Sequence, residues 1–503
     1  MAISALLVLV ISAALGVACV AVARRVSLRV GLVDRPDGSR KFQPLPVAVC
    51  GGVGVLAAAA LALAAAAAVR PDLVASLAAQ PARLLALLAG AVVIAAVGLI
   101  DDLVALRARH KLLGQAAAAL VLIGPGGYVI DGLSLLGVHV ELGYLAIPVT
   151  LLWFLAAINA INLLDGMDGL LGTVSVIIFG SLAAMALGLG NDFSGYVALA
   201  MAGALLGFLV FNLPPASVYL GDCGSMLIGL VVAALAISSS LKGPAVALVG
   251  PTVLLVLPIL DTTAAIVRRK LTGRGVAAPD RGHFHHEMQR RYANRWLVLA
   301  AAAFLGLIGA AGALVGTFLS NDLYALGAGG VVLAVLGVTG WFGLAEFRLI
   351  GSRAGATYRS VRGPKDAVES AVQLQGSAEW KEFWRKLVRL AEALEVTSLR
   401  LDVNAPAWHE SFHGRWDRSD SRVGVYLAAD YWRAEVPVAV QGAVVGKLSL
   451  VGSAARLPMV EQLGRMTAAL PDVERILPPR PAPGGREVAA PAAAQPERLA
   501  TSA

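Results

Sequence analysis

Long apolar runs separated by short polar linkers dominate the first 346 residues of the chain. A membrane-spanning helix needs about 20 predominantly apolar residues. The fourth run is the least regular, because Gly124-Pro125-Gly126-Gly127 interrupts it. The pattern predicts an all-α polytopic membrane protein with eleven spans, at residues 3–23, 47–69, 82–100, 112–130, 144–162, 170–190, 194–211, 225–241, 245–267, 296–318 and 323–346.

The composition supports a membrane protein and excludes an ordinary soluble one. Hydrophobic residues make up 58% of the 503 residues and charged residues only 15%, whereas soluble domains are about 45–50% apolar and about 25% charged. The apolar run at 3–23 lacks a basic segment before it, so we expect a retained span rather than a cleaved signal peptide. The net charge of +8 comes from clusters of Arg and Lys, and we expect no nucleic-acid partner.

Alternate linkers between the spans are basic. Residues 24–46 contain six Arg or Lys, 101–111 contain three, and 268–295 contain eight. On the other side, 70–83 contain two and 237–244 contain one. Because cytoplasmic loops carry the Lys and Arg excess, the amino terminus is expected outside and the carboxyl terminus inside. This orientation brings the polar motifs described below to the cytoplasmic face of the membrane.

The sequence changes character after the transmembrane region, which we place at residues 1–346. Residues 347–365 read as a linker, 366–477 as a small cytoplasmic α+β domain, and 478–503 as a disordered tail rich in Pro, Ala and Gly. Within the domain, the spacing of apolar residues predicts a helix over 377–395. Strands are expected at 397–404, 422–429, 432–440 and 447–453, with a hairpin turn at Gln441-Gly442 and a closing helix at 456–470.

Two adjacent carboxylates, Asp101 and Asp102, follow the third span directly. Charged groups at membrane depth cost about 2.5–3.5 kcal/mol each on the insertion scale, so they usually face a cavity and have a function. Adjacent carboxylates repel, which raises at least one pKa unless a cation balances them. The pair can therefore act as a base or bind a divalent cation. The alternative is a solvated helix end.

The string NAINLLDGMDGL contains Asn162, Asp165 and Asp168 at intervals of three residues. On a helix or its frayed end, this spacing places the three side chains on one face. Amide and carboxylate oxygens suit Mg²⁺; the alternative is a polar loop with turn glycines. Asp222, in YLGDCGS, is expected to be a second metal ligand, although it could instead cap the helix that follows.

A histidine-rich loop follows the ninth span. Arg281, His283, His285 and His286 lie within six residues, and further basic residues precede them. A basic loop that faces phosphates is the simplest interpretation. A zinc site is one alternative, although zinc prefers three or four N or S ligands held rigidly and no cysteine is near. A plain positive-inside loop is the other.

Four further residues complete the set of candidates. Asn212 and Tyr219 offer an amide and an aromatic face, which are the parts that a nucleobase pocket needs. Lys111 adds a cation at the same face, or is only a topology charge. Asp261, in PILDTT, is expected to be structural or to orient the loop that follows it.

Taken together and in this order, these strings resemble the polyprenyl-phosphate N-acetylhexosamine-1-phosphate transferase family. The resemblance is carried by GLVDRPDGSRK, GLIDDL, NAINLLDGMDGL, YLGDCGSM, PILDT and PDRGHFHH, and it covers about residues 30–295. The histidine motif with Arg281 resembles the branch that uses UDP-GlcNAc-type donors. The resemblance does not extend to the C-terminal domain.

The resemblance implies a cytoplasmic cleft that binds Mg²⁺, with Mn²⁺ as the alternative metal. Asn162 and Asp222 would be the metal ligands, and Asp102, or the Asp101-Asp102 pair, would deprotonate or orient the lipid phosphate. The substrate-binding residues would be Asp165 and Asp168, which support the metal and sugar nucleotide; Asn212 and Tyr219, which hold uracil; and Lys111, Arg281, His283, His285 and His286, which bind the pyrophosphate and sugar.

The function expected from the sequence is therefore transfer of N-acetylhexosamine 1-phosphate from a UDP-N-acetylhexosamine to a polyisoprenyl phosphate. A cation-coupled transporter would use intramembrane carboxylates too, but it would spread them toward the bilayer midplane. A non-catalytic scaffold would tolerate replacement of the motif residues. A homodimer, and a cytoplasmic partner for residues 366–477, are further hypotheses.

Overall fold

A computed structural model describes residues 2–34, 46–239, 248–272, 282–292, 294–341, 368–376, 379–405, 408, 410–418, 431–453 and 457–477. Within these residues, nine helical segments are long and apolar enough to cross a membrane. They are α1 (Ala2–Val30), α2 (Gly51–Val69), α4 (Pro81–Val104), α6 (Ala146–Leu164) with its preceding turn, α7 (Leu170–Gly188), α8 (Asp192–Asn212), α9 (Gly221–Ser239), α13 (Arg295–Phe318) and α14 (Asp322–Thr339).

Two further predicted spans correspond to shorter helices. Helix α5 (Ala108–Ile123) starts before its predicted position and stops where Gly124 and Pro125 interrupt the apolar run, since proline cannot continue the hydrogen-bond ladder. The span expected at 245–267 is divided into α10 (Val249–Leu254) and α11 (Val256–Thr272). A polytopic helical protein is thus confirmed, and the total of eleven spans stays a prediction.

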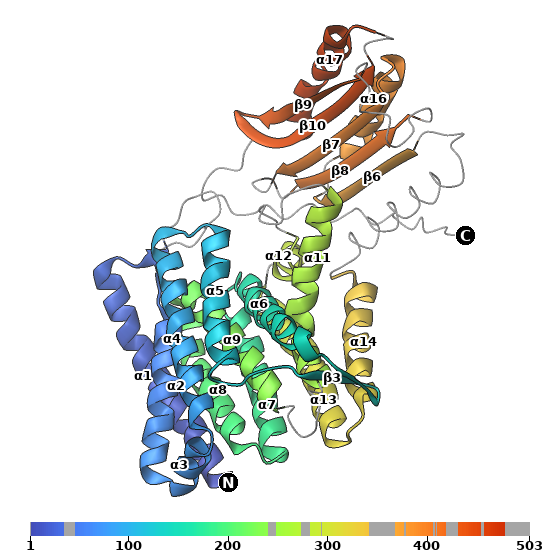
Figure 1. Ribbon diagram of the computed structural model, residues 1–503. Helices are drawn as coiled ribbons and strands as arrows, with labels where there is room; N and C mark the ends of the chain where they lie inside the picture. The colour runs from blue at the N-terminus through green and yellow to red at the C-terminus, as the bar shows by residue number, and fades with distance from the viewer. Residues whose placement is uncertain are drawn as a thin grey trace, which may run out of the picture.

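Successive long helices run up and down the bundle, so the loops that connect them alternate between its two ends (Figure 1). The amino terminus and the short helix α3 (Pro71–Ala78) lie at one end. The ends of α4, α6 and α11 and the starts of α5 and α9 lie at the other, together with α12 (Phe284–Arg291). The polar motifs therefore gather at one end of the bundle, as the alternation of linkers predicts.

Helix α9 forms the centre of the bundle. Of its most apolar 18-residue stretch, 89% is buried, compared with 22% for α1. Glycines let neighbouring helices approach it closely: a Cβ on Gly98 of α4 would lie 2.4 Å from the Cα of Cys223. Because α9 begins at the end that carries the polar motifs, Asp222 in its first turn is held in a densely packed position.

Short strands lie at both ends of the bundle. At the end with the motifs, β1 (Val33–Asp34), β2 (Val47–Val49) and β5 (Val218–Tyr219) form a small sheet in the order β1-β2-β5. At the opposite end, β3 (Gly132–Leu135) and β4 (Val138–Glu141) form an antiparallel hairpin, followed by a 3₁₀ turn at Gly143–Leu145. The sequence analysis predicted neither.

The C-terminal region contains a five-stranded antiparallel sheet in the order β6-β8-β7-β10-β9. Its apolar core includes Trp380 and Trp384 of the amphipathic helix α16. The elements are β6 (Val368–Gln375), α16 (Trp380–Ala393), β7 (Ser398–Ala405), β8 (Glu410–Asp417), β9 (Tyr431–Val440), β10 (Ala443–Ser453), α17 (Met459–Thr467), a 3₁₀ turn (Leu470–Asp472) and α18 (Val473–Ile476).

The predicted hairpin at Gln441-Gly442 is confirmed, because β9 and β10 pair on either side of it. Both turn residues have positive φ, at 49° and 77°, as a two-residue hairpin turn of this hand requires. Strands β6 and β8 were not predicted. The strand expected at 422–429, the linker at 347–365 and the tail at 478–503 lie outside the described residues. The domain boundaries stay predictions.

Candidate active site

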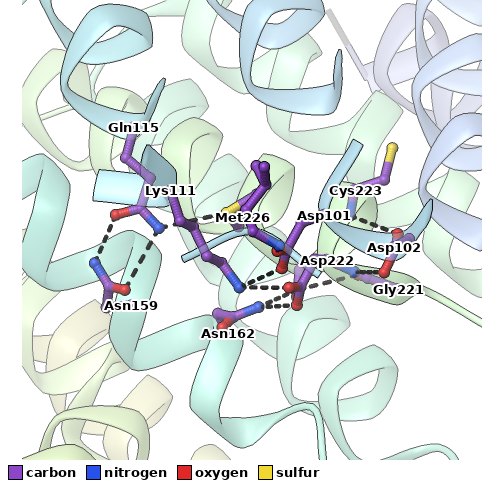
Figure 2. Close-up of polar contacts among 12 residues, drawn as sticks. Asp101, Asp102, Lys111, Gln115, Asn159, Asn162, Gly221, Asp222, Cys223 and Met226 are labelled. Carbon is purple, nitrogen blue, oxygen red and sulfur yellow. Dashed lines mark hydrogen bonds and ion pairs between the residues drawn. The ribbon is translucent and has the colours of Figure 1, made fainter. Parts of the chain in front are cut away.

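Four helix ends bring the acidic motifs together (Figure 2). Asp101 and Asp102 lie in the last turn of α4, and Lys111 lies in the first turns of α5. Asn162 lies in the last turn of α6, and Asp222 in the first turn of α9. Segments that are up to 121 residues apart in the chain therefore form one polar cluster at the end of the bundle.

Lys111 is the centre of this cluster. Its Nζ lies 3.1 Å from Oδ2 of Asp101 and also forms an ion pair with Asp222. The three side chains are largely withdrawn from solvent, with exposed fractions of 18% for Lys111, 12% for Asp101 and 28% for Asp222. Two carboxylates this close would repel without a cation between them, so the ammonium group holds them in place.

The amide of Asn162 fixes Asp222 from the other side. Its Nδ2 donates to Oδ1 of Asp222 at 2.6 Å and to Oγ of Ser225 at 2.7 Å. Ser225 in turn donates to the carbonyl of Gly221 at 3.1 Å. Ser225 was not identified from the sequence, although its position three residues after Asp222 on a helix places both on one face.

Asp102 has a different environment from Asp101. Its Oδ1 accepts from the backbone N–H of Asp222 at 2.9 Å and its Oδ2 from that of Cys223 at 3.2 Å. Asp102 thus satisfies the free N–H groups at the start of α9, where a carboxylate is favoured by the helix dipole. A Cβ on Gly221, whose φ is +71°, would lie 2.5 Å from Asp102 Oδ2. Asp102, and not Asp222, is therefore the cap of α9.

The donor set of this cluster fits Mg²⁺. Among the described residues, no three His, Cys, Asp or Glu side chains are arranged to hold a metal ion by themselves. Mg²⁺ does not need such a set, because it binds through one or two carboxylates and takes waters and substrate phosphates as its other ligands. Asp222 and the amide oxygen of Asn162 supply oxygen ligands of that kind, and the two carboxylates around Lys111 already attract a cation.

The loop after α6 contains the two remaining acidic candidates, Asp165 and Asp168, and they have different partners. The helix ends at Leu164, so Asn162 lies on it, whereas Asp165 and Asp168 lie in the turn that follows. Asp168 accepts from Arg295 Nη1 at 2.9 Å and from the N–H of Ala216 at 3.2 Å. The expected single face of three oxygen side chains is therefore wrong for Asp168, because the helix stops before it.

Asp165 remains near the cluster. Burial, together with the charges of Asp222 and Asp102, raises the pKa of Asp165 to about 7. Among the described residues, no hydrogen bond to its carboxylate is found that would offset this. A carboxyl group in this state favours a proton or a cation beside it, which is the behaviour of a group that supports a metal or its ligands.

Asn212 and Tyr219 lie beside this loop but are used differently. The Oδ1 of Asn212 accepts from the N–H of Gly169 at 3.0 Å, and its Nδ2 donates to the carbonyl of Val218 at 2.8 Å. Asn212 thus joins the loop after α6 to strand β5, where burial raises the pKa of Tyr219 to about 12. Direct contact of the Asn212 amide with a nucleobase stays a prediction, since these contacts give it a positioning role.

The histidine segment is organised by one buried carboxylate. Asp261 on α11 is only 1% exposed, and its Oδ2 lies 2.9 Å from Nδ1 of His283. Its Oδ1 accepts from the N–H of Phe284 at 2.8 Å, at the start of α12. Asp261 therefore orients the segment that follows, as the sequence predicted. A carboxylate on Nδ1 also fixes the histidine tautomer and leaves Nε2 as the reactive nitrogen.

His285 reaches the loop that carries Asp165. A Cβ on Gly166 would lie 2.2 Å from Nε2 of His285, so only glycine leaves room for this ring. His285 is 2% exposed, and neither of its ring nitrogens has a hydrogen-bond partner within the part of the chain that the structure describes. Burial holds the pKa of His285 well below its usual range. His286 packs against it with ring centroids 4.2 Å apart. Arg281 lies outside the described residues.

A second polar network lies one helix turn below the cluster and was missed by the sequence analysis. Asn159 Nδ2 donates to Gln115 Oε1 at 2.8 Å, and Gln115 Nε2 contacts the sulfur of Met226 at 3.3 Å (Figure 2). Gln115 follows Lys111 by four residues and Asn159 precedes Asn162 by three, which is the signal that could have identified them. The network connects α5, α6 and α9 beneath the site.

Comparison with known proteins gives a consistent result. The model of glycosyl transferase family 4 matches residues 84–240, which include Asp101, Lys111, Asn162 and Asp222. Over 270 residues, the chain is 32% identical to the probable undecaprenyl-phosphate N-acetylglucosaminyl 1-phosphate transferase of Bacillus subtilis (strain 168), covering 53% of this chain and 72% of that protein.

Two further relatives come from other bacteria. The decaprenyl-phosphate N-acetylglucosaminephosphotransferase of Mycobacterium tuberculosis (strain CDC 1551 / Oshkosh) is 32% identical over 49% of this chain and 67% of its own length. The undecaprenyl-phosphate alpha-N-acetylglucosaminyl 1-phosphate transferase of Yersinia pestis is 29% identical over 58% of this chain and 80% of its own length. On this similarity, the chain belongs to glycosyl transferase family 4, in the group of polyprenyl-phosphate N-acetylglucosamine-1-phosphate transferases.

Proposed function

We propose that this protein transfers N-acetylglucosamine 1-phosphate from UDP-GlcNAc to a polyprenyl phosphate in the membrane. An oxygen of the lipid phosphate attacks the β-phosphorus of the sugar nucleotide, the bond between the two phosphates breaks, and UMP leaves. The product is a lipid-linked sugar pyrophosphate. The observation that carries the proposal is the cluster of Asp101, Lys111, Asn162 and Asp222 beside a histidine segment, in a chain of this family.

Phosphoryl transfer depends mainly on positioning and on neutralising charge. Asp222 and Asn162 would hold Mg²⁺, which supplies positive charge to the pyrophosphate when it is bound. In the proposed substrate complex, Lys111 exchanges part of its ion pairing with the two carboxylates for contact with a phosphate oxygen. His285, whose ring nitrogens have no partner among the described residues, would donate or accept a hydrogen bond at the pyrophosphate or sugar.

Within the acidic pair, Asp101 is the better candidate for contact with the lipid phosphate. Both carboxylate oxygens of Asp102 already accept from the backbone of α9. Asp101 accepts from the backbone N–H of Leu106 at 2.6 Å through Oδ1 only, and its Oδ2 pairs with Lys111. When Lys111 turns to a substrate phosphate, this Oδ2 can receive a proton or orient the incoming phosphate. Asp102 is accordingly assigned to holding Asp222 in position.

The cellular setting is part of the proposal. The basic linkers support a site on the cytoplasmic face of the bacterial inner membrane, with eleven spans and with UDP-GlcNAc entering from the cytoplasm. Magnesium as the metal, and a homodimer as the assembly, are proposed with it. For the C-terminal sheet we retain two roles, regulation by a cytoplasmic partner and docking of the next glycosyltransferase. Truncation after residue 359 should then leave basal turnover within about twofold, since neither role supplies a catalytic group.

The experiment that tests the proposed reaction is release of UMP from UDP-GlcNAc by purified protein supplied with undecaprenyl phosphate and Mg²⁺. The variant Asp222→Asn should lose about 10²–10³-fold in turnover, the usual effect of removing one group that stabilises transferred charge. The matched control is Asp72→Asn, at the opposite end of the bundle, where Asp72 pairs with Arg70 at 2.9 Å.

Asp72→Asn should retain wild-type turnover. Equal turnover of Asp222→Asn and wild type would reject the catalytic role of Asp222, and a wild type that releases no UMP would reject the transferase. If Asp222→Asn instead abolished a cation flux across proteoliposomes, with no UMP released by the wild type, the transporter would be the better interpretation.

A further inference from the structure

A polar pocket lies at the end of the bundle opposite the candidate active site. It has a volume of about 400 Å³ and is formed by the α3–α4 turn, the start of α8 and the end of α9. Ser239 closes α9 at this end, whereas Asp222 lies at its other end. At about 1.5 Å per residue, the two are about 25 Å apart along the helix axis. The pocket is therefore separate from the active site, and no step of the proposed reaction uses it.

Two buried polar atoms at this pocket have no hydrogen-bond partner among the described residues. They are Oγ of Ser239, a residue that is 3% exposed, and Oδ1 of Asp192. Their neighbours are satisfied: Ser238 Oγ lies 2.7 Å from Ser194 Oγ, and Asn191 Nδ2 donates to the carbonyl of Ser238 at 2.7 Å. A buried polar group without a partner loses the hydrogen bonds that it makes to water in the unfolded chain, so such groups usually face a ligand or ordered water.

The pocket also contains a positioned cation. Arg83 donates from Nη1 to Gln80 Oε1 at 2.9 Å, and its guanidinium carbon lies 5.7 Å from the centre of the Tyr128 ring. These contacts leave other guanidinium donors for an anion, and the forked guanidinium matches the geometry of a phosphate or a carboxylate. The pocket thus offers one guanidinium for a phosphate and one carboxylate with a vacant acceptor.

The volume and position of the pocket restrict the ligand. A single water occupies about 30 Å³, so the cavity has room for much more than one water, and it falls within the usual size range of small-ligand sites. The pocket lies where the membrane-length helices α4, α8 and α9 start or end, which is the level of the lipid headgroups. The most abundant molecules there are phospholipids.

We propose that this pocket binds an ethanolamine phosphate group, presented as the headgroup of a phospholipid. The phosphate would pair with Arg83 and the primary ammonium would donate to the vacant Oδ1 of Asp192, with Ser239 Oγ as a further partner. A choline headgroup carries a similar charge but has no N–H, so it leaves the acceptor of Asp192 unsatisfied. A glycerol headgroup lacks the ammonium, so Asp192 remains without a counter-charge.

Native mass spectrometry of the full-length protein in detergent, with competing phosphatidylethanolamine, phosphatidylcholine and phosphatidylglycerol, tests this assignment. The wild type should retain phosphatidylethanolamine about tenfold better than either competitor, as expected for one charge-assisted hydrogen bond. Asp192→Asn should lose this discrimination, and Arg83→Gln should weaken the binding of all three lipids. Matched controls are Asp72→Asn and Arg70→Gln, which alter an ion pair at the same end outside the pocket.

Soluble phosphoethanolamine provides a second arm. If it competes with the lipid for the wild type, the headgroup alone is recognised; if it does not, the acyl chains add to binding, and both results agree with the proposal. Equal retention of the three lipids by the wild type would overturn it, as would loss of discrimination in the control variants. UMP release should stay within about twofold in all four variants, so failure of this inference leaves the proposed reaction untouched.

Discussion

In the acidic cluster, Lys111 lies between Asp101 and Asp222, and the amide of Asn162 holds Asp222 from the other side. In the histidine segment, by contrast, the carboxylate of Asp261 orients His283, while the ring nitrogens of His285 have no partner in the described ranges of the chain. The first region is already satisfied by charges within the protein. The second is held in place and leaves polar atoms vacant.

This difference suggests a division of work within the site. Carboxylates that lie close together need a counter-ion before any substrate arrives, because burying an unbalanced charge costs free energy. Neutral imidazoles can be left without partners at a lower cost and then bind a phosphate or sugar when it enters. Disruption of the acidic cluster should therefore impair turnover most, and changes in the histidine segment should act mainly through substrate binding.

The largest effect among the following variants is expected for Lys111→Met. Removing the ammonium leaves Asp101 and Asp222 to repel each other, so turnover should fall about 10²-fold. Lys111→Arg should retain part of the activity, since it keeps the charge. The measurement is the rate of UMP release at saturating UDP-GlcNAc. Lys386→Met, which removes an exposed lysine paired with Asp472, is the matched control and should have wild-type turnover.

A smaller effect is expected for Gly166→Ala, which tests the role of the histidine segment. The added methyl would lie 2.2 Å from Nε2 of His285 and displace the ring. The KM for UDP-GlcNAc should rise about tenfold, the effect of losing one good polar contact, with a smaller change in kcat. Gly180→Ala is the control, because a methyl there meets nothing within 4 Å. An unchanged KM in Gly166→Ala would show that His285 does not contribute to the binding of UDP-GlcNAc.

Asp261→Asn should act on the same step with a smaller loss, of about three- to tenfold. The amide oxygen can still accept from the N–H of Phe284, but the charged partner of His283 is lost. His283→Gln should cause a similar loss, and the double variant should be no worse than either single one, because the two residues act together. Additive losses in kcat/KM would show that Asp261 acts through something other than His283.

The smallest effect concerns stability rather than rate. The folded-state pKa of Asp165 is raised from 3.8 to about 7, so the folded protein holds an extra proton between these values. The stabilisation is complete at low pH and is lost as the pH rises through about 7. In EDTA, the melting temperature of the wild type should therefore fall more between pH 5 and pH 8 than that of Asp165→Asn. An equal fall in melting temperature for the two proteins would contradict the raised pKa of Asp165.

The membrane helices could be predicted from the sequence because hydropathy and helix length are local properties. The helix over 377–395 and the Gln441-Gly442 hairpin follow local rules too, and both are found. Strand β8 was missed because its sequence, ESFHGRWD, has only two apolar side chains, Phe412 and Trp416, with Gly414 between them, which makes the alternation weak. The β3–β4 hairpin is only four residues per strand, too short to stand out between two apolar runs.

The candidate site was predictable in its composition and less so in its contacts. Asp101, Asn162 and Asp222 come together as expected, because each follows or begins an apolar run at the same end of the bundle. The role of Asp102 as the cap of α9 depends on how closely α4 packs against α9, which no local pattern encodes. The same holds for the contact between His285 and Gly166, which joins segments that are more than 100 residues apart.

The account rests most directly on Asp222 as the residue through which a divalent metal strengthens donor binding. Calorimetric titration of UDP-GlcNAc into the wild type and Asp222→Asn, each with Mg²⁺ and with EDTA, measures this. Mg²⁺ should strengthen binding to the wild type about tenfold or more, equivalent to about 1.4 kcal/mol, and should have no effect on Asp222→Asn. The same gain from Mg²⁺ in both proteins would contradict the account.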